Sequence, residues 1–222
     1  RTLHRDLVAS LVERVENLYS NGFLMPLNDS WQRAIDADPT WKIDNVVGQR
    51  RFYEQHVVPI RNKGAKVIVI ISDALRFEIG EELLRRIRAV DRFEARIEPM
   101  LGSLPSYTQI GMGALLPNRD LRIAEEGSGV LVDGESASGT ENRGKILARR
   151  ADAGTTAAVQ SDAVSRMDKD AVRALIRDND VVYIYHNLID ATGDKTASEG
   201  QVFEAAERAI QDLEQLVRRL AG

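Results

Sequence analysis

The stretch KVIVIISD, residues 66–73, decides the fold of this chain. Five consecutive β-branched residues follow Lys66, a pattern typical of a strand buried on both faces of a parallel sheet. A second apolar run, Val181-Val182-Tyr183-Ile184-Tyr185, has the same character. Amphipathic segments alternate with such runs, so the sequence predicts an α/β fold with a mainly parallel sheet, right-handed crossovers and helices on both faces.

The expected elements around these two strands follow from hydrophobic periodicity and from capping and turn residues. A helix after residue 73 turns Phe77, Leu83, Leu84, Ile87 and Val90 inward, and the last helix does the same with Val202, Ala206, Ile210, Leu213, Val217 and Leu220. The remaining predictions are strands at 93–100, 130–132 and 155–159, and helices at 106–116, around 146–147 and at 168–177.

The first sixty or so residues are predicted to be a helical lead-in. One helix carries an apolar face and ends at the C-cap pair Asn21-Gly22. A second, capped near residues 28–30, ends at Asp38-Pro39, and a third runs from about Val46 to Val58, before Pro59. Because the pattern changes at Asn62-Lys63-Gly64, we expect a helical subdomain at 1–62 and an α/β domain at 63–222.

Composition limits the class of protein. Hydrophobic residues make up 43% of the 222 residues and charged residues 29%, a balance typical of a globular domain. The net charge of −4 argues against nucleic-acid binding by this segment alone, and the lack of cysteine removes disulfides and thiolate metal sites. No apolar stretch approaches the roughly 20 residues of a membrane span, and the N-terminus lacks the apolar core of a signal peptide. We therefore expect a cytoplasmic location. The chain starts within a helical pattern, and we interpret it as a segment of a longer protein.

Carboxylates follow both central strands. Asp73 comes directly after the first, while Asp190 and Asp194 stand four positions apart just past the second. Ligands bind beyond the carboxyl ends of strands in open parallel sheets, and a divalent cation relieves the repulsion between converging carboxylates. The alternative for Asp73 is to cap the helix that begins near Leu75.

A hydroxyl group lies between these acids in the sequence. The stretch Leu104-Pro105-Ser106-Tyr107-Thr108-Gln109 carries hydroxyl groups and precedes an apolar helix. Free backbone N–H groups at a helix N-terminus stabilise an anion, so a hydroxyl there is well placed to attack a phosphate group. The alternative is capping by Ser106. Residues 139–145 have P-loop spacing, but Ile146 stands where Mg²⁺ needs Ser or Thr. We interpret this segment as a turn whose Arg143 and Lys145 are solvated or face an anionic ligand.

Three pieces in this order resemble the alkaline phosphatase superfamily, including its nucleotide pyrophosphatase branch: Asp73, Pro105-x-x-Thr108 and Asp190-x-x-x-Asp194. Two motifs look like the PglZ domain of bacterial BREX phage-defence systems: Ile71-Ser72-Asp73-Ala74-Leu75-Arg76 and Tyr185-His186-Asn187-x-x-Asp190-x-x-Gly193-Asp194. This resemblance covers nearly the whole chain.

The resemblance implies two divalent metals, Zn²⁺, Mn²⁺ or Mg²⁺. Asp73 and Thr108 would serve one metal, with Thr108 as nucleophile, and Asp190 and Asp194 would serve the other. Asp194 stands where the wider superfamily has histidine, which favours Mn²⁺ or Mg²⁺. The superfamily's remaining ligands, an Asp-His pair and a further His, are absent after Asp194. The resemblance therefore implies an alkaline-phosphatase-like core that is incomplete at the C-terminus, and a segment that is inactive alone.

Four further residues are candidates for contacts to the substrate or to a metal ligand, namely Arg76, Arg143, His186 and Asn187. The leading hypothesis is a metal-dependent phosphoesterase-type domain of a phage-defence protein that hydrolyses a phosphomonoester or phosphodiester, with nucleic acid among the expected substrates. The expected partners are other BREX subunits. The rival hypothesis is a catalytically silent scaffold or regulatory domain that binds those subunits.

Overall fold

The computed structural model describes residues 2–38, 40–125, 127, 129–150, 154–193 and 201–222. Contacts divide the chain into two compact units, Arg1–Asp44 and Asn45–Gly222, which are described separately below. The second unit begins before the predicted domain boundary at 62/63, because residues 45–62 pack with the α/β core. Tyr53 and Val57, for example, are fully buried there.

Residues 2–37 of the first unit form one continuous helix, called the helical rod below. Helix α1 (Thr2–Asn17) passes through a π-helical segment, η1 (Leu18–Leu24), into α2 (Met25–Ala37). The predicted helix end at Asn21-Gly22 is wrong, because the wider π-helical turns of η1 include this pair without leaving helical geometry. The predicted cap near residues 28–30 is also wrong, because these residues lie inside α2. Pro26 is tolerated since it falls in the first turn of α2. The predicted stop at Asp38 is confirmed.

The second unit is built on a parallel three-stranded sheet, with strand order β2-β8-β7. Strand β2 (Val67–Ser72) pairs in parallel with β8 (Val181–His186), which pairs in parallel with β7 (Thr156–Gln160). All six residues of β8 are buried, as expected for a strand covered on both faces. The predicted α/β class and the parallel sheet are confirmed.

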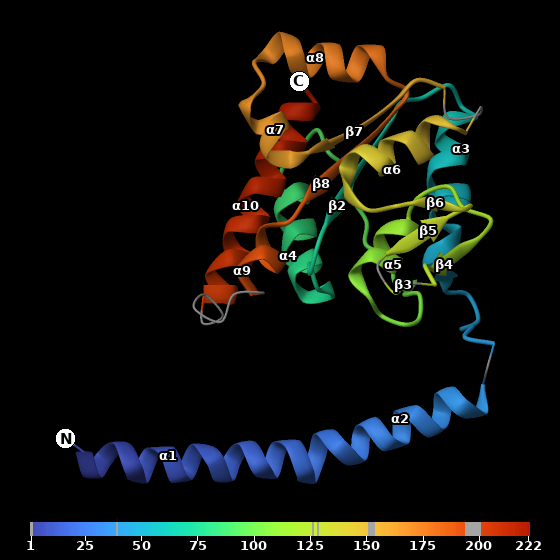
Figure 1. The fold of residues 1–222 in the computed structure, drawn as a ribbon. Coiled ribbons are helices and arrows are strands. Elements are labelled where there is room, and N and C mark those ends of the chain that lie inside the picture. Colours follow the sequence, from blue (N-terminus) through green and yellow to red (C-terminus); the bar gives the residue numbers. More distant parts are fainter. Residues whose placement is uncertain (1, 39, 126, 128, 151–153, 194–200) are drawn as a thin grey trace. The chain divides into compact units, whose positions relative to one another are not determined.

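Apolar side chains fill both faces of this sheet. On one face Tyr183 and Tyr185 pack with residues of α5 (Thr108–Ala114) and α6 (Gly139–Ala148). On the other face Val182 and Ile184 pack with residues of α7 (Ser161–Arg166), α8 (Lys169–Asp178) and α10 (Val202–Leu220). Figure 1 shows these helices on the two sides of the strands. The predicted covering of both faces is therefore confirmed.

Two small sheets complete the unit. Strand β1 (Val47–Gly48) pairs in parallel with β3 (Met100–Leu101), and β4 (Leu121–Ile123), β5 (Val130–Val132) and β6 (Glu135–Ser136) form an antiparallel sheet. The strand predicted over 93–100 is therefore wrong except at Met100. The helix predicted over 46–58 is broken into β1, the 3₁₀ turn η2 (Gln49–Arg51), the π-helical η3 (Tyr53–Val57) and α3 (Val58–Arg61). Helix α3 contains Pro59 in its first turn, where no N–H is needed.

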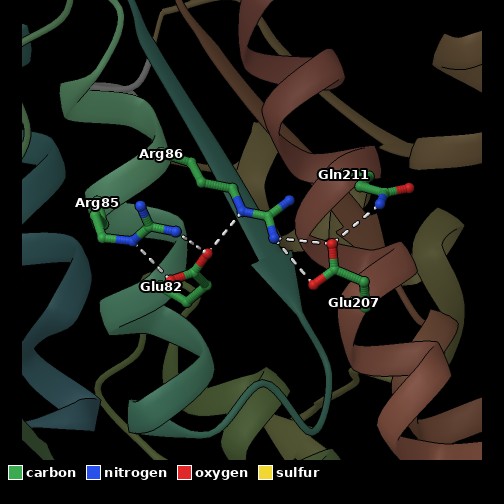
Figure 2. A network of polar contacts seen from close by, with 5 residues as sticks. All are labelled: Glu82, Arg85, Arg86, Glu207 and Gln211. Atoms are coloured by element: carbon green, nitrogen blue, oxygen red, sulfur yellow. Dashed lines mark hydrogen bonds and ion pairs between the residues drawn. The ribbon is translucent and has the colours of Figure 1, made fainter.

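An ionic network joins α4 (Phe77–Arg88) to α10 (Figure 2). Glu82 accepts hydrogen bonds from Arg85 and Arg86, which hold the pKa of its carboxyl at about 2. Arg86 also reaches across to Glu207 at 2.8 and 3.0 Å, and Gln211 donates to the same carboxylate. Within this network Arg86 is the residue that bridges α4 and α10.

Among the described residues, no helix is both long and apolar enough to cross a membrane.

Candidate functional site

The carboxyl ends of β2 and β8 bring two of the predicted acids to one edge of the sheet. Ser72 is in register with His186, and the backbone N–H of Asp73 donates to the carbonyl of His186 at 2.9 Å. The ladder thus continues one residue past β2 and places Asp73 beside Asn187. Helix α9 (Leu188–Gly193) begins at once and carries Asp190 in its first turn. Both carboxylates are half-buried at neighbouring strand ends, as the parallel pattern predicts.

Asp73 does not cap the following helix. The N-cap of α4 is Arg76, whose own side chain makes no capping hydrogen bond. The Asp73 carboxylate instead accepts from the N–H of Ala74 at 3.0 Å, within a turn where Ala74 has a φ of 58°. A positive φ is costly for alanine, so the turn is held by its surroundings in an unusual conformation. Asp73 is therefore not the N-cap residue of this helix.

Thr108 is the first residue of α5, and its side chain is exposed. The N-cap is Tyr107 without a side-chain bond, so capping by Ser106 is also wrong. The rest of the helix is firmly anchored. Met112 lies in the core, and the Tyr183 hydroxyl of β8 donates to the carbonyl of Leu115 at 2.8 Å. The sheet thus fixes the short helix that presents the threonine.

His186 is only 5% exposed and projects to the face opposite Tyr185. Its Nδ1 lies 2.8 Å from the Ser72 hydroxyl, and its Nε2 lies 4.0 Å from a carboxylate oxygen of Asp212 on α10. Burial lowers the pKa of this imidazole, and the Asp212 charge opposes that shift in part. The ring therefore links the ends of β2 and β8 to α10.

The two predicted arginines differ in setting. Arg76 is exposed, with its Nε 3.9 Å from Glu78. Arg143 is half-buried on α6, so the turn predicted for residues 139–145 is wrong, because this segment is helical. Its Nε donates to the carbonyl of Ala137 at 2.9 Å, and its guanidinium lies over the ring of Tyr185 at 4.7 Å. Asn187 is exposed at the strand end. Asp194 lies outside the described residues.

The donor set at this edge consists of oxygen atoms. Asp73 and Asp190 offer carboxylates, which suit hard cations such as Mn²⁺ or Mg²⁺. Among the described residues, no group of three His, Cys, Asp or Glu side chains is gathered closely enough to hold a metal.

Sequence reasoning missed the side-chain partners around these positions. The Ser72 contact of His186 and the stacking of Arg143 on Tyr185 were not predicted. The only signal available was strand register, since Ser72 and His186 each end a central strand and face each other once the strands align. Register cannot be read from two uniformly apolar runs, because neither run alternates.

Comparison with known proteins identifies the family. Residues 52–222 match the sequence model of a family described as the BREX system PglZ alkaline phosphatase-like domain. The chain is 41% identical over 220 residues to the alkaline phosphatase-like protein BrxZ of Escherichia coli O9:H4 (strain HS), covering 96% of the chain and 25% of that protein. It is 37% identical over 218 residues to the alkaline phosphatase-like protein PglZ of Bacillus cereus (strain H3081.97), covering 97% of the chain and 25% of that protein. The chain therefore spans a quarter of the length of these relatives, and it belongs to the family of PglZ alkaline phosphatase-like domains of BREX systems.

Proposed function

We propose that this chain is part of a metal-dependent phosphoesterase domain of a phage-defence protein, acting in the cytoplasm on a phosphomonoester or phosphodiester. Its nucleophile would be Thr108. The observation that carries the proposal is the backbone bond from Asp73 to His186, which brings Asp73 and the Asp190 segment to one sheet edge. Membership of an alkaline phosphatase-like family supports the same reaction class.

The residues divide the work as follows. Asp73 and Thr108 would hold one divalent cation, and Asp190 with Asp194 a second. Bound cations would supply positive charge that lowers the pKa of a hydroxyl and neutralises phosphate oxygens. The Thr108 oxygen would lose its proton to water and form a bond to phosphorus while the bond to the leaving oxygen breaks, and the leaving oxygen would take up a proton from water. Water then hydrolyses the phosphothreonine.

The test is turnover of an aryl phosphomonoester and an aryl phosphodiester, with Mn²⁺ and with Zn²⁺, in a protein of the length that the relatives have. Thr108→Ala should abolish turnover, because no other atom occupies the nucleophile's position. Thr108→Ser keeps the hydroxyl and should retain measurable activity. Circular dichroism checks that both variants fold. Near wild-type turnover in Thr108→Ala would remove Thr108 as the nucleophile.

A second function is scaffolding of other BREX subunits. It is favoured by the apolar side chains exposed along the helical rod, among them Val8, Leu11, Val15 and Leu18. Asp73→Ala and Asp190→Ala separate the two functions in an assay that reports both assembly and hydrolysis. A scaffold tolerates both substitutions, whereas an enzyme assembles normally and loses hydrolysis. Binding of nucleic acid by this segment is disfavoured by a pI of about 5.5, and a salt-dependent shift of DNA mobility would revive it.

A further inference from the structure

We propose that His186 is a positioning residue of the candidate site: its ring bond to Ser72 fixes the end of β2 against the end of β8, and thereby sets the separation of the Asp73 and Asp190 carboxylates. The inference rests on the proposed function only for the cation that these carboxylates would bind. Along β8 the ring lies on the face opposite α5, the helix that begins with Thr108. His186 therefore acts through the strand ends and not by contact with a substrate.

The pairing of β2 with β8 stops where the two acids begin. Ser72 and His186 are the last residues of these strands and are in register. Asp73 follows Ser72 directly, and Asp190 comes four positions after His186, in α9. Two bonds join the strand ends: the Ser72 hydroxyl lies 2.8 Å from Nδ1 of the ring, and the Asp73 N–H donates to the His186 carbonyl at 2.9 Å. The separation of the acids therefore depends on how firmly this last pair of residues is joined.

The partners of the ring assign its tautomer. Nε2 lies 4.0 Å from a carboxylate oxygen of Asp212 on α10, and an ionised carboxylate only accepts hydrogen bonds. A neutral ring therefore carries its proton on Nε2, and Nδ1 is left to accept from the Ser72 hydroxyl. Among the described residues this buried Nε2 has no hydrogen-bond partner of good geometry, but Asp212 is 57% exposed and can turn towards it. The Ser72 hydroxyl is thus the donor of the side-chain bond that joins the two strands.

Helix α10, which the ring faces, also contacts the elements around both acids. It packs beside α9, the helix that carries Asp190 (Figure 1). The ionic network of Figure 2 ties it to α4, the helix that follows the Asp73 turn. The His186 ring is 5% exposed, so it is enclosed between the sheet edge and this helix. The ring therefore restrains Asp73 through Ser72, and Asp190 through the packing of α10 on α9.

A small displacement of two metal-binding carboxylates is costly. Ligand distances to a divalent cation are fixed to within about 0.2 Å, so carboxylates that drift apart lose affinity for it. Groups that orient metal ligands through hydrogen bonds typically contribute about 10–100-fold to metal affinity. Because the Ser72 bond acts on the residue before Asp73 and not on the carboxylate itself, we expect an effect at the low end, roughly tenfold.

The experiment measures deuterium uptake at single amides by mass spectrometry, without metal, in a protein of the relatives' length. Ser72→Ala and His186→Leu both remove the ring bond, and each should speed uptake at the Asp73 amide roughly tenfold, the scale of one lost hydrogen bond. His186→Asn keeps a hydrogen-bonding group near the position of Nδ1 and should restore slow uptake in part. Ser165→Ala is the matched control: it removes a hydroxyl that donates to the Ser161 carbonyl within α7, and should leave the Asp73 amide unchanged.

Amides in the middle of the strands separate positioning from general stability. A merely structural ring would speed uptake equally at Asp73, Val69 and Ile184, whereas a positioning ring speeds it chiefly at the strand end. Equal acceleration at these amides, or no acceleration at Asp73, overturns the proposal, as does an equal effect of Ser165→Ala. Fast uptake in His186→Asn overturns the part given to the ring bond.

Binding of Mn²⁺ then tests the effect on the acids. Isothermal titration with Mn²⁺ alone should show roughly tenfold weaker binding in Ser72→Ala and His186→Leu, and binding closer to wild type in His186→Asn. Unchanged affinity in all three variants overturns the positioning role, even where uptake is faster. Absence of Mn²⁺ binding in the wild-type protein counts against the proposed function, and deuterium uptake at Asp73 then decides on His186 by itself. Turnover by Thr108 enters neither measurement.

Discussion

Two glycines in α5, the helix that presents Thr108, should respond in opposite ways to alanine. A Cβ on Gly113 would lie 2.9 Å from Leu121, 3.2 Å from Val132 and 3.3 Å from Val130. A Cβ on Gly111 would meet only the end of the flexible Gln49 side chain, at 3.3 Å. Alanine favours a helix over glycine by about 0.5–1 kcal/mol, whereas overpacking a core costs about 1–3 kcal/mol.

The gain in helix propensity and the cost of overpacking weigh differently at the two positions. At Gly113 two of the three neighbours are stiff β-branched residues of the buried strand β5, so overpacking exceeds the helix gain. We expect Gly113→Ala to lower the free energy of unfolding by about 0.5–2 kcal/mol. At Gly111 the Cβ would meet the amide nitrogen of Gln49, whose oxygen accepts from the N–H of Ser103 at 3.1 Å, so the side chain needs to give by only a few tenths of an ångström. We expect Gly111→Ala to raise the free energy of unfolding by up to about 0.5–1 kcal/mol.

The assay is urea unfolding followed by circular dichroism, with each variant compared with wild type at equal slope. Using both positions of one helix cancels any general effect of alanine on its propensity. Stabilisation by Gly113→Ala of the same size as that by Gly111→Ala would refute the reasoning, because it would mean that α5 does not pack closely on β5.

Three further predictions concern stability. The raised pKa of Tyr185, about 12 against an ordinary 10.0, means that folding favours the neutral phenol. The resulting stability is complete below pH 10 and is lost as pH rises towards 12. Urea unfolding from pH 9 to 12 should therefore show a fall that Tyr185→Phe reduces by about 2–3 kcal/mol. Arg86→Gln should lower the melting temperature more than Arg85→Gln, because only Arg86 reaches Glu207, and added salt should shrink the difference, which thermal scans would detect. Asp168→Ala removes the side-chain cap of α8 and should cost about 1 kcal/mol in chemical denaturation, whereas Asp168→Asn, which keeps a capping oxygen, should cost less.

The two central strands were predictable because continuous β-branched runs have few stable alternatives. The strand predicted over 93–100 failed because alternation shows only that one face is apolar, and a strand also needs a partner. In the structure only Met100 and Leu101 find one, in β1. The helical rod was predicted in type but not in continuity, since capping residues such as Asn21-Gly22 are signals that π-helical turns can override.

The candidate site was also predictable only in part. That Asp73 and Asp190 share an edge follows from parallel pairing, which the sequence indicated. The stacking of Arg143 on Tyr185 depends on how α6 lies across β7, and no local pattern encodes that. The sequence therefore predicted the carboxyl edge of the sheet and its two carboxylates, whereas the position of Arg143 depends on how α6 packs.

The backbone bond from Asp73 to His186 also has a consequence for motion. Amides inside a buried ladder exchange with solvent only when a large part of the domain opens, whereas amides in loops exchange freely. Because the Asp73 amide is bonded to β8, the acid should share the slow exchange of the central strands although it lies beyond the end of β2. Its carboxylate is then carried by the most slowly opening part of the unit. A charge held so firmly needs little reorganisation when a cation or a phosphate arrives.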